Sequence, residues 1–123
     1  MKRGFFLFFI LSYFVFSGCA SQMYAWKNYE SSLYKYYKDP TQKERFIKNL
    51  EKIIKKSERK GKVPPGIYAE YGYMLYESQR YPDAIVYFQK EKNLWPESQC
   101  FMNKMIENAE RMMDNTFAVV VEE

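Results

Sequence analysis

Apolar residues recur along the chain with the period of an α-helix. Tyr29, Leu33 and Tyr36 follow one another at intervals of four and three residues, which places them on one helical face. The pair Asp39-Pro40 ends this pattern, because a residue that precedes proline disfavours the helical backbone. We therefore predict a first helix over residues 26–38.

A second and stronger apolar stripe predicts a helix over residues 41–60. Thr41 and Glu44 fit a capping box, in which the two side chains satisfy the first N–H groups of a helix. Gly61 is the expected stop, since glycine readily adopts the left-handed backbone that closes a helix. The apolar positions share one face and should enter the core: Phe46, Ile47, Leu50, Ile53 and Ile54.

The central stretch, Pro64–Pro96, predicts a helical hairpin. Its helices cover residues 67–78 and 82–94, and the polar residues Ser78-Gln79-Arg80 separate them. Pro82 suits the first turn of the second helix, where a missing N–H costs little. Two antiparallel helices that share one core should result.

Residues at five positions of this hairpin match the signature of the tetratricopeptide repeat, a helix-turn-helix unit of about 34 residues: Gly72, Tyr81, Ala84, Phe88 and Pro96. Gly72 has no side chain and should let the second helix approach closely. We expect Ala84 to face it and Phe88 to fill the space between the helices. The predicted fold class is therefore all-α, with antiparallel hairpins that resemble tetratricopeptide repeats and about five helices.

A last helix is predicted from residue 97 to about residue 115 and should cover the open side of the hairpin. Its apolar stripe contains Phe101, Met102, Met105, Ile106, Ala109, Met112 and Met113. Cys100 adjoins this stripe, so we expect a buried thiol that acts as a small hydrophobe; a reactive or intermolecular thiol is the alternative. Residues 116–123 form an apolar, β-prone tail that either packs on the core or adds a strand to a partner's sheet.

The amino terminus has the pattern of an export signal. Lys2 and Arg3 precede the apolar run 5–16, which is long enough for the core of a signal peptide and short for a membrane span. Phe16-Ser17-Gly18-Cys19 resembles the bacterial lipobox, although the lipobox usually has an aliphatic residue where Phe16 stands. The resemblance implies a signal peptide over residues 1–18 and a lipid on Cys19; the alternatives are an uncleaved anchor or an ordinary secretory signal.

The lipobox resemblance also implies a location. An aspartate after the cysteine would favour the inner membrane in enterobacterial sorting, but Ala20 stands there, so the outer membrane is expected. Residues 19–23 form a short tether, and its four residues after Cys19 span about 15 Å when extended. The helical domain over residues 24–115 should therefore lie close to the membrane, on its periplasmic face.

Composition narrows the possible chemistry. Aromatic residues make up 20% of the chain, which favours a packed core over disorder. The sequence has no histidine, so it lacks the commonest general base and the commonest neutral metal ligand. The formal charge of +4 includes Lys2 and Arg3, and without them 17 basic against 15 acidic residues leave +2. We predict no catalytic residue, cofactor, metal site, small-molecule substrate or nucleic-acid partner.

Positive charge concentrates in the basic segment 43–62. It holds nine Lys or Arg residues against Glu44, Glu51 and Glu58, a local excess of six. One interpretation is a basic surface that attracts anionic lipid, peptidoglycan or an acidic partner; the other is a solvated face with pairs such as Glu44–Lys48 and Glu51–Lys55. The candidate basic surface comprises Lys48, Lys52, Lys55, Lys56 and Arg59.

A second candidate surface follows from the repeat pattern. In tetratricopeptide repeats the first helix lines a groove, and the resemblance places Tyr73, Tyr76 and Glu77 there. Tyrosines bind peptides by apolar contact and by hydroxyl hydrogen bonds. Ala69 and Tyr73 stand where chaperone-binding members have basic or amide residues, so carboxylate clamping is not expected. The alternative is that these tyrosines pack against the first helix.

Several segments together resemble a family of small bacterial lipoproteins with a tetratricopeptide-like fold. They are residues 24–26, Tyr29, residues 63–70 and residues 91–98. The resemblance covers roughly residues 24–106 and implies an envelope assembly component, encoded beside a lipoprotein that is similar to the curli secretion channel. It implies no catalytic residue.

Three hypotheses follow. The first is a non-enzymatic outer-membrane adaptor that binds another envelope protein, with the curli-channel-like lipoprotein as a candidate partner. The second is a peptidoglycan or anionic-lipid binder that uses residues 43–62. The third is an enzyme subunit, for which only scattered carboxylates such as Glu70, Glu77 and Glu91 are available. Glu70 and Glu77 should lie about 10 Å apart along one helix, which suits a solvated face better than a catalytic pair.

Overall fold

The computed structural model describes residues 23–26 and 28–121, and it describes side chains as far as residue 116. These residues form five α-helices: α2 (Tyr29–Lys38), α3 (Lys43–Arg59), α4 (Ile67–Glu77), α5 (Tyr81–Leu94) and α6 (Gln99–Val121). Short 3₁₀ turns, Pro40–Gln42 and Pro96–Ser98, precede α3 and α6. The prediction of an all-α fold with about five helices is confirmed, and no strand occurs in the described residues.

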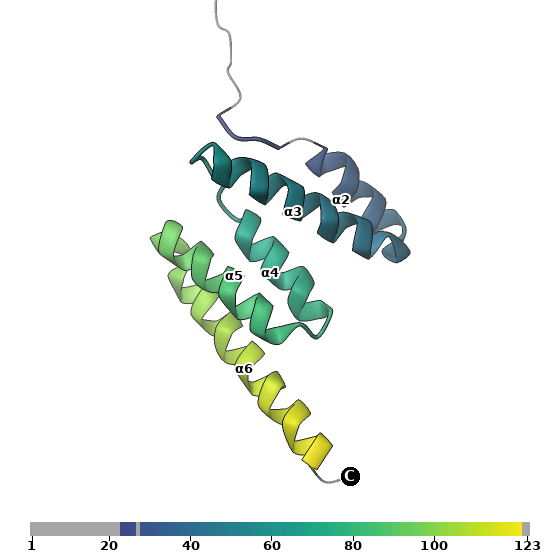
Figure 1. The fold of residues 1–123 in the computed structure, drawn as a ribbon, viewed down its shortest axis with the longest axis vertical. Helices are drawn as coiled ribbons and strands as arrows, with labels where there is room; N and C mark the ends of the chain where they lie inside the picture. Colours follow the sequence, from purple (N-terminus) through teal and green to yellow (C-terminus); the bar gives the residue numbers. More distant parts are fainter. Residues whose placement is uncertain (1–22, 27, 122–123) are drawn as a thin grey trace, which may run out of the picture.

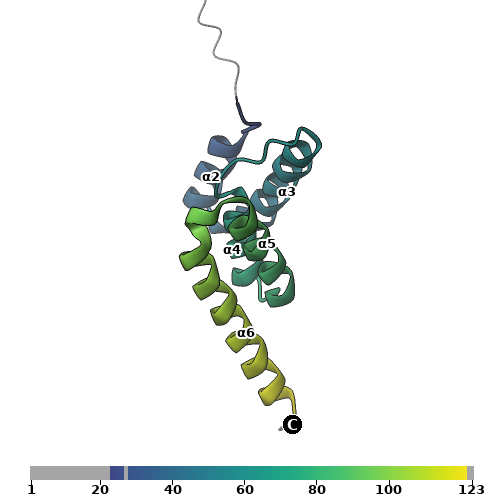
Figure 2. The ribbon, with the colours of Figure 1, turned by 90° about the vertical axis from the view of Figure 1, so that its left-hand side faces the viewer.

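The helices follow one another in space in the order of the sequence. Figure 1 shows α2 and α3 side by side at one end, the hairpin of α4 and α5 next to them, and α6 against α5. The described chain begins beside α2 and α3, and α6 carries the other end of the chain away from them (Figures 1 and 2). None of the described helices combines the length and apolar character needed to cross a membrane.

The core lies between α3 and the α4–α5 hairpin. All five residues of the predicted α3 stripe are buried, as expected, and they meet Ile67, Leu75 and Phe88 from the hairpin. From α2, the predicted face formed by Tyr29, Leu33 and Tyr36 packs on this core while it stays half-buried. The Tyr36 ring stacks on Phe46 with 5.4 Å between centroids and 7° between planes. Aromatic stacking therefore fixes α2 against α3.

Two predicted helix starts are wrong. The first helix begins at Tyr29 instead of residue 26, because Asn28 has a left-handed backbone with φ 62°. Thr41 does not cap α3: Pro40 begins a 3₁₀ turn that contains Thr41, and Asp39 caps this turn instead. The Thr41 amide and hydroxyl donate to Asp39 Oδ1 at 3.1 and 2.7 Å. The capping residue is therefore the one before proline, where an extended backbone is favoured.

The ends of α3 and α4 share one geometry. Gly61 ends α3 as predicted, with φ 63°, and the Lys62 amide donates to Ser57 O at 3.1 Å. At the end of α4 the same left-handed position is occupied by Gln79, with φ 60°, and the Arg80 amide donates to Leu75 O at 2.9 Å. A side chain in this conformation is strained, whereas glycine is not.

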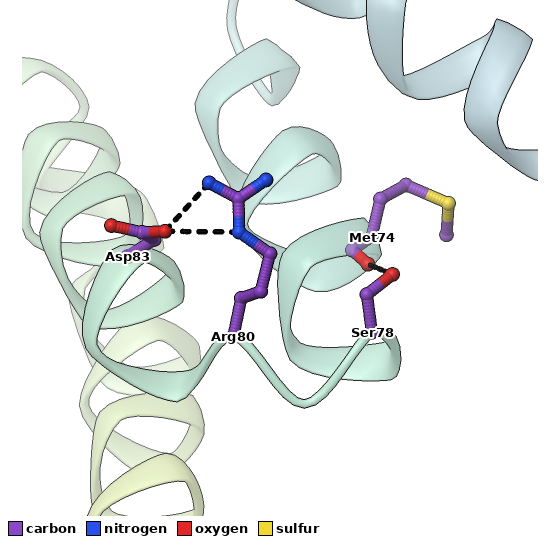
Figure 3. A network of polar contacts seen from close by, with 4 residues as sticks. All are labelled: Met74, Ser78, Arg80 and Asp83. Carbon is purple, nitrogen blue, oxygen red and sulfur yellow. Dashed lines mark hydrogen bonds and ion pairs between the residues drawn. The ribbon is translucent and has the colours of Figure 1, made fainter.

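Polar contacts hold the turn between α4 and α5 in place (Figure 3). The Ser78 hydroxyl donates to Met74 O at 2.8 Å, and Arg80 donates to Asp83 Oδ2 at 3.0 and 2.7 Å through Nε and Nη2. These contacts end one helix and begin the next within three residues.

Gly72 lies where α4 and α5 approach most tightly, as the repeat pattern predicts. A Cβ atom added there would stand 2.9 Å from two ring carbons of Phe88 and 3.3 Å from Ala84 O. Phe88 is only 1% exposed, so its ring is enclosed by the core. A side chain at position 72 would therefore force this crossing to shift.

Helix α6 departs from its prediction in two ways. Met102 and Ala109 are buried, but Cys100 is exposed and Phe101 is 63% exposed, so the expectation of a buried thiol is wrong. Because α6 packs mainly on α5, only a narrow stripe of it is covered. The helix also continues through residues 116–121, where we expected a separate β-prone tail, since no glycine or proline interrupts it.

Candidate functional site

The candidate surface on α4, formed by Tyr73, Tyr76 and Glu77, contains one tyrosine that packs on the core and one that is exposed. Tyr73 is 45% exposed and stacks on Tyr76, with 6.5 Å between ring centroids and 18° between planes. Tyr76 is half-buried, packs on the core, and meets Tyr81 edge-on at 5.4 Å. The ring of Tyr76 is therefore held by the core, and the exposed ring of Tyr73 packs on it.

Glu77 lies one helical turn from Tyr73 and is exposed. Hydrogen bonding to Glu77 and the charge of its carboxylate raise the pKa of the Tyr73 hydroxyl. A tyrosine hydroxyl is protonated at neutral pH in any case, so Tyr73 offers a hydrogen-bond donor there. The structure thus brings the three predicted residues together at one surface of α4.

Glu91, which sequence reasoning treated only as a scattered carboxylate, caps α4 from α5. It is 2% exposed, and Oε1 accepts from the Gly66 amide at 2.7 Å while Oε2 lies 3.4 Å from the Ala69 amide. Gly66 stands at the N-cap position and has no side chain with which to cap the helix itself. Burial raises the pKa of Glu91, and the backbone amides oppose this effect.

Glu70 also has a structural partner. The Tyr29 hydroxyl donates to Glu70 Oε2 at 2.6 Å and joins α2 to α4. Burial raises the pKa of Glu70. The pKa of Tyr29 is also raised, mainly by burial and secondly by its hydrogen bond to the Glu70 carboxylate. Glu70 and Glu91 thus each have a structural role: Glu70 joins α2 to α4, and Glu91 caps α4.

Glu58 turns away from the basic residues of its own helix. It accepts from the Tyr68 hydroxyl at 2.8 Å and from Lys90 Nζ at 3.1 Å. Burial raises the pKa of Glu58, but the hydrogen bonds from Tyr68 and Lys90 outweigh it, so that the net pKa is lowered. One of the three carboxylates in segment 43–62 therefore neutralises the charge of Lys90 on α5 instead of a cation of the basic surface.

Two adjoining clefts lie along the basic surface. We call the first the α2–α3 cleft: it has a volume of about 430 Å³ and is lined by Asn28, Ser31, Ser32, Lys35, Gln42, Arg45, Phe46, Lys48, Asn49 and Lys52. The second, the α3 cleft, has a volume of about 420 Å³ and is lined by Ala25, Asn28, Asn49, Lys52, Ile53, Lys55, Lys56 and Arg59. Asn28, Asn49 and Lys52 line both clefts, so the two lie next to each other.

The lining of both clefts carries cations and no carboxylate. Every residue of the predicted basic surface lines one cleft or the other, and Lys35 and Arg45 add to them. Lys55 pairs with Glu51 at 2.7 Å, as expected, but the predicted Glu44–Lys48 pair does not occur in the described part of the chain. Most of this positive charge is therefore uncompensated by ion pairs among the described residues.

Asn49 fixes the junction between the clefts. Its Nδ2 donates to Ser32 Oγ at 2.7 Å and lies 3.4 Å from Asn28 O, while the Ser32 hydroxyl donates to Tyr29 O at 2.9 Å. These contacts tie the first turn of α2 to the middle of α3. The walls of the clefts are thus held by hydrogen bonds, and sequence reasoning, which considered the basic helix alone, missed them.

Two further predictions concern Cys19 and metal binding. Cys19 lies outside the described residues. Between Met23 and Val121, as far as the structure describes the chain, no group of three or more Cys, Asp or Glu side chains is placed to hold a metal ion.

Residues 23–105 match the protein family described as a domain of unknown function, DUF4810. No curated protein and no solved structure matches the chain. The matched range contains both candidate surfaces and all helices from α2 to α5.

Proposed function

The chain belongs to the DUF4810 family. From its lipobox-like segment and its exposed tyrosine on α4, we propose that it is a non-enzymatic lipoprotein of the bacterial outer membrane that acts as an adaptor for another envelope protein. In this proposal Cys19 carries the lipid, and the helical domain stands on the periplasmic face. The α4–α5 hairpin is proposed to be a tetratricopeptide-like unit, which the tight packing of Gly72 against Phe88 and Ala84 supports.

The observation that carries the adaptor proposal is the position of Tyr73. Tyr73 is exposed and stacks on the half-buried Tyr76, so its side chain is already restricted and loses little conformational entropy when a partner binds. Its hydroxyl remains a donor at neutral pH, while Glu77 beside it offers an acceptor. An aromatic anchor next to a polar residue is typical of protein interfaces.

Site-specific crosslinking in living cells tests this proposal. A photoreactive amino acid replaces Tyr73 in one strain and Val86 in another; Val86 lies on α5 and is 49% exposed, so the two positions are matched in exposure. We expect one defined envelope protein to crosslink at position 73 and not at position 86. The curli-channel-like lipoprotein is the first candidate to probe. Equal patterns at both positions would contradict the adaptor role of Tyr73.

The anchor is tested separately. Cys19→Ser should leave an uncleaved precursor without bound fatty acid, and mass spectrometry of the purified wild-type protein should find diacylglycerol on Cys19. A wild-type protein that is cleaved elsewhere, or is not acylated, would contradict the proposed location.

A further inference from the structure

The basic surface of α3 has a single sign of charge over its full length. Its cations are spaced by three or four residues, apart from one adjacent pair, and occupy about a third of the helix circumference: Arg45, Lys48, Lys52, Lys55, Lys56 and Arg59. Glu44, Glu51 and Glu58 are spaced by seven residues and lie on a neighbouring face. Most of the cations of α3 are thus separated from its carboxylates, and among the described residues Lys55, which pairs with Glu51, is the exception.

This separation is unfavourable for the protein alone. Lys48, Lys52 and Lys56 follow one another at intervals of four residues, where like charges repel and destabilise a helix. Only Lys55 among the cations of the two clefts has an ion pair in the described residues. An anion bound in the clefts would remove this repulsion.

We propose that the α2–α3 cleft and the α3 cleft bind the phosphate groups of anionic phospholipids in the membrane to which the protein is anchored. The cleft volumes, about 430 and 420 Å³, lie in the range of small-molecule sites. Lysine ammonium groups and the arginine fork bind phosphate oxygens strongly. The fixed amide of Asn49, between the clefts, adds a polar wall.

The position of the clefts in the chain identifies the occupant. Ala25 lines the α3 cleft and is six residues from Cys19, so an extended connection spans about 20 Å. The described chain also begins at the α2–α3 end of the molecule (Figure 1). This choice of occupant rests on the proposed anchor at Cys19, because a lipid there brings headgroups within reach of both clefts. Attraction of basic residues to an anionic bilayer is strong near the surface and falls within a Debye length.

Lysine footprinting of the full lipidated protein tests the proposal. The protein is placed in nanodiscs of phosphatidylcholine alone, or of phosphatidylcholine with phosphatidylglycerol, and acetylation of each lysine is followed by mass spectrometry. We expect the cleft lysines Lys48, Lys52, Lys55 and Lys56 to react several-fold more slowly in the anionic discs, and the protection to disappear at high salt. Lys104, exposed on α6, should react equally in both.

A charge-matched pair of variants completes the test. Changing Lys48, Lys52 and Lys56 to Gln should abolish the slower reaction of Lys55 in anionic discs, whereas changing Lys92, Lys104 and Arg111 to Gln should leave it intact. Equal reaction rates in both discs overturn the proposal. So does protection by soluble glycerol phosphate in neutral discs, which would assign the clefts to a free phosphate ligand. Protection in anionic discs supports phospholipid binding by the two clefts. This result does not depend on the mass-spectrometry test of Cys19 or on the crosslinking test at Tyr73.

Discussion

Substitution of Gly72 tests the tightest contact of the hairpin. In Gly72→Ala the new Cβ stands 2.9 Å from two ring carbons of Phe88, closer than carbon atoms approach in proteins, and Ala84 O closes the other side at 3.3 Å. Such overpacking costs about 1–3 kcal/mol. Alanine is better than glycine inside a helix by about 0.5–1 kcal/mol, which offsets part of the cost.

We therefore expect Gly72→Ala to lower the free energy of unfolding by about 1 kcal/mol, within the range of about 0–2.5 kcal/mol that separates these two effects. Urea unfolding of the purified protein in detergent, followed by circular dichroism at 222 nm, measures it. The wild-type protein and the variant should have equal m-values, because the unfolded states expose the same surface.

A double-mutant cycle identifies the cause. Phe88→Leu removes the ring carbons that Cβ would meet, so the double variant should lose less stability than the sum of the single variants, with a coupling of about 1 kcal/mol. Gly61→Ala is the control: its Cβ meets nothing within 4 Å, and its cost comes from φ 63°. Phe88→Leu should not relieve that cost. A stabilising Gly72→Ala, or additive effects with Phe88→Leu, would refute the reasoning.

Three further predictions concern the polar contacts. Glu91→Ala should destabilise the protein by about 1–3 kcal/mol in urea unfolding, because the first amides of α4 lose their cap, whereas Glu97→Ala, on the surface, should have little effect. Gln79→Gly should stabilise the protein by about 0.5–1 kcal/mol, because glycine adopts the left-handed backbone without strain. Gln89→Gly, in the middle of α5, should destabilise it by a similar amount. A Gln79→Gly variant that is less stable than the wild type would contradict this prediction. The lowered pKa of Glu58 stabilises the folded state above its unfolded pKa of about 4.3, and this stabilisation is lost as the pH falls through the folded pKa. The stability difference between wild type and Glu58→Gln should therefore shrink between about pH 5 and pH 3, and a constant difference would count against the contact with Tyr68 and Lys90.

The sequence predicted those parts of the fold that depend on local pattern. The α3 stripe from Phe46 to Ile54 was identified because five buried residues repeat at helical spacing. Gly72 and Phe88 were identified because the sequence resembles a repeat signature in which a glycine faces the second helix, and the structure brings these two residues into contact. The caps were harder to predict: Asp39 displaces Thr41 because proline begins a 3₁₀ turn, which the capping pattern does not take into account.

The parts that were missed depend on contacts between distant residues. Glu91 caps α4 across 25 positions, and only Gly66, with no side chain to offer, hinted that a cap must come from elsewhere. Cys100 and Phe101 continue an apolar stripe, but burial depends on how many helices cover α6, and α5 alone covers most of it. The basic surface was visible as a charge count, whereas its clefts require the packing of α2 on α3.

The cap that Glu91 supplies couples the two ends of the hairpin. The amides of Gly66 and Ala69, at the start of α4, donate to a side chain in the last turn of α5, so we expect these two helix ends to open together. Native-state hydrogen exchange should therefore show these amides opening together with the end of α5 and not as a frayed terminus. In thermodynamic terms, the hairpin between the two prolines is one cooperative unit.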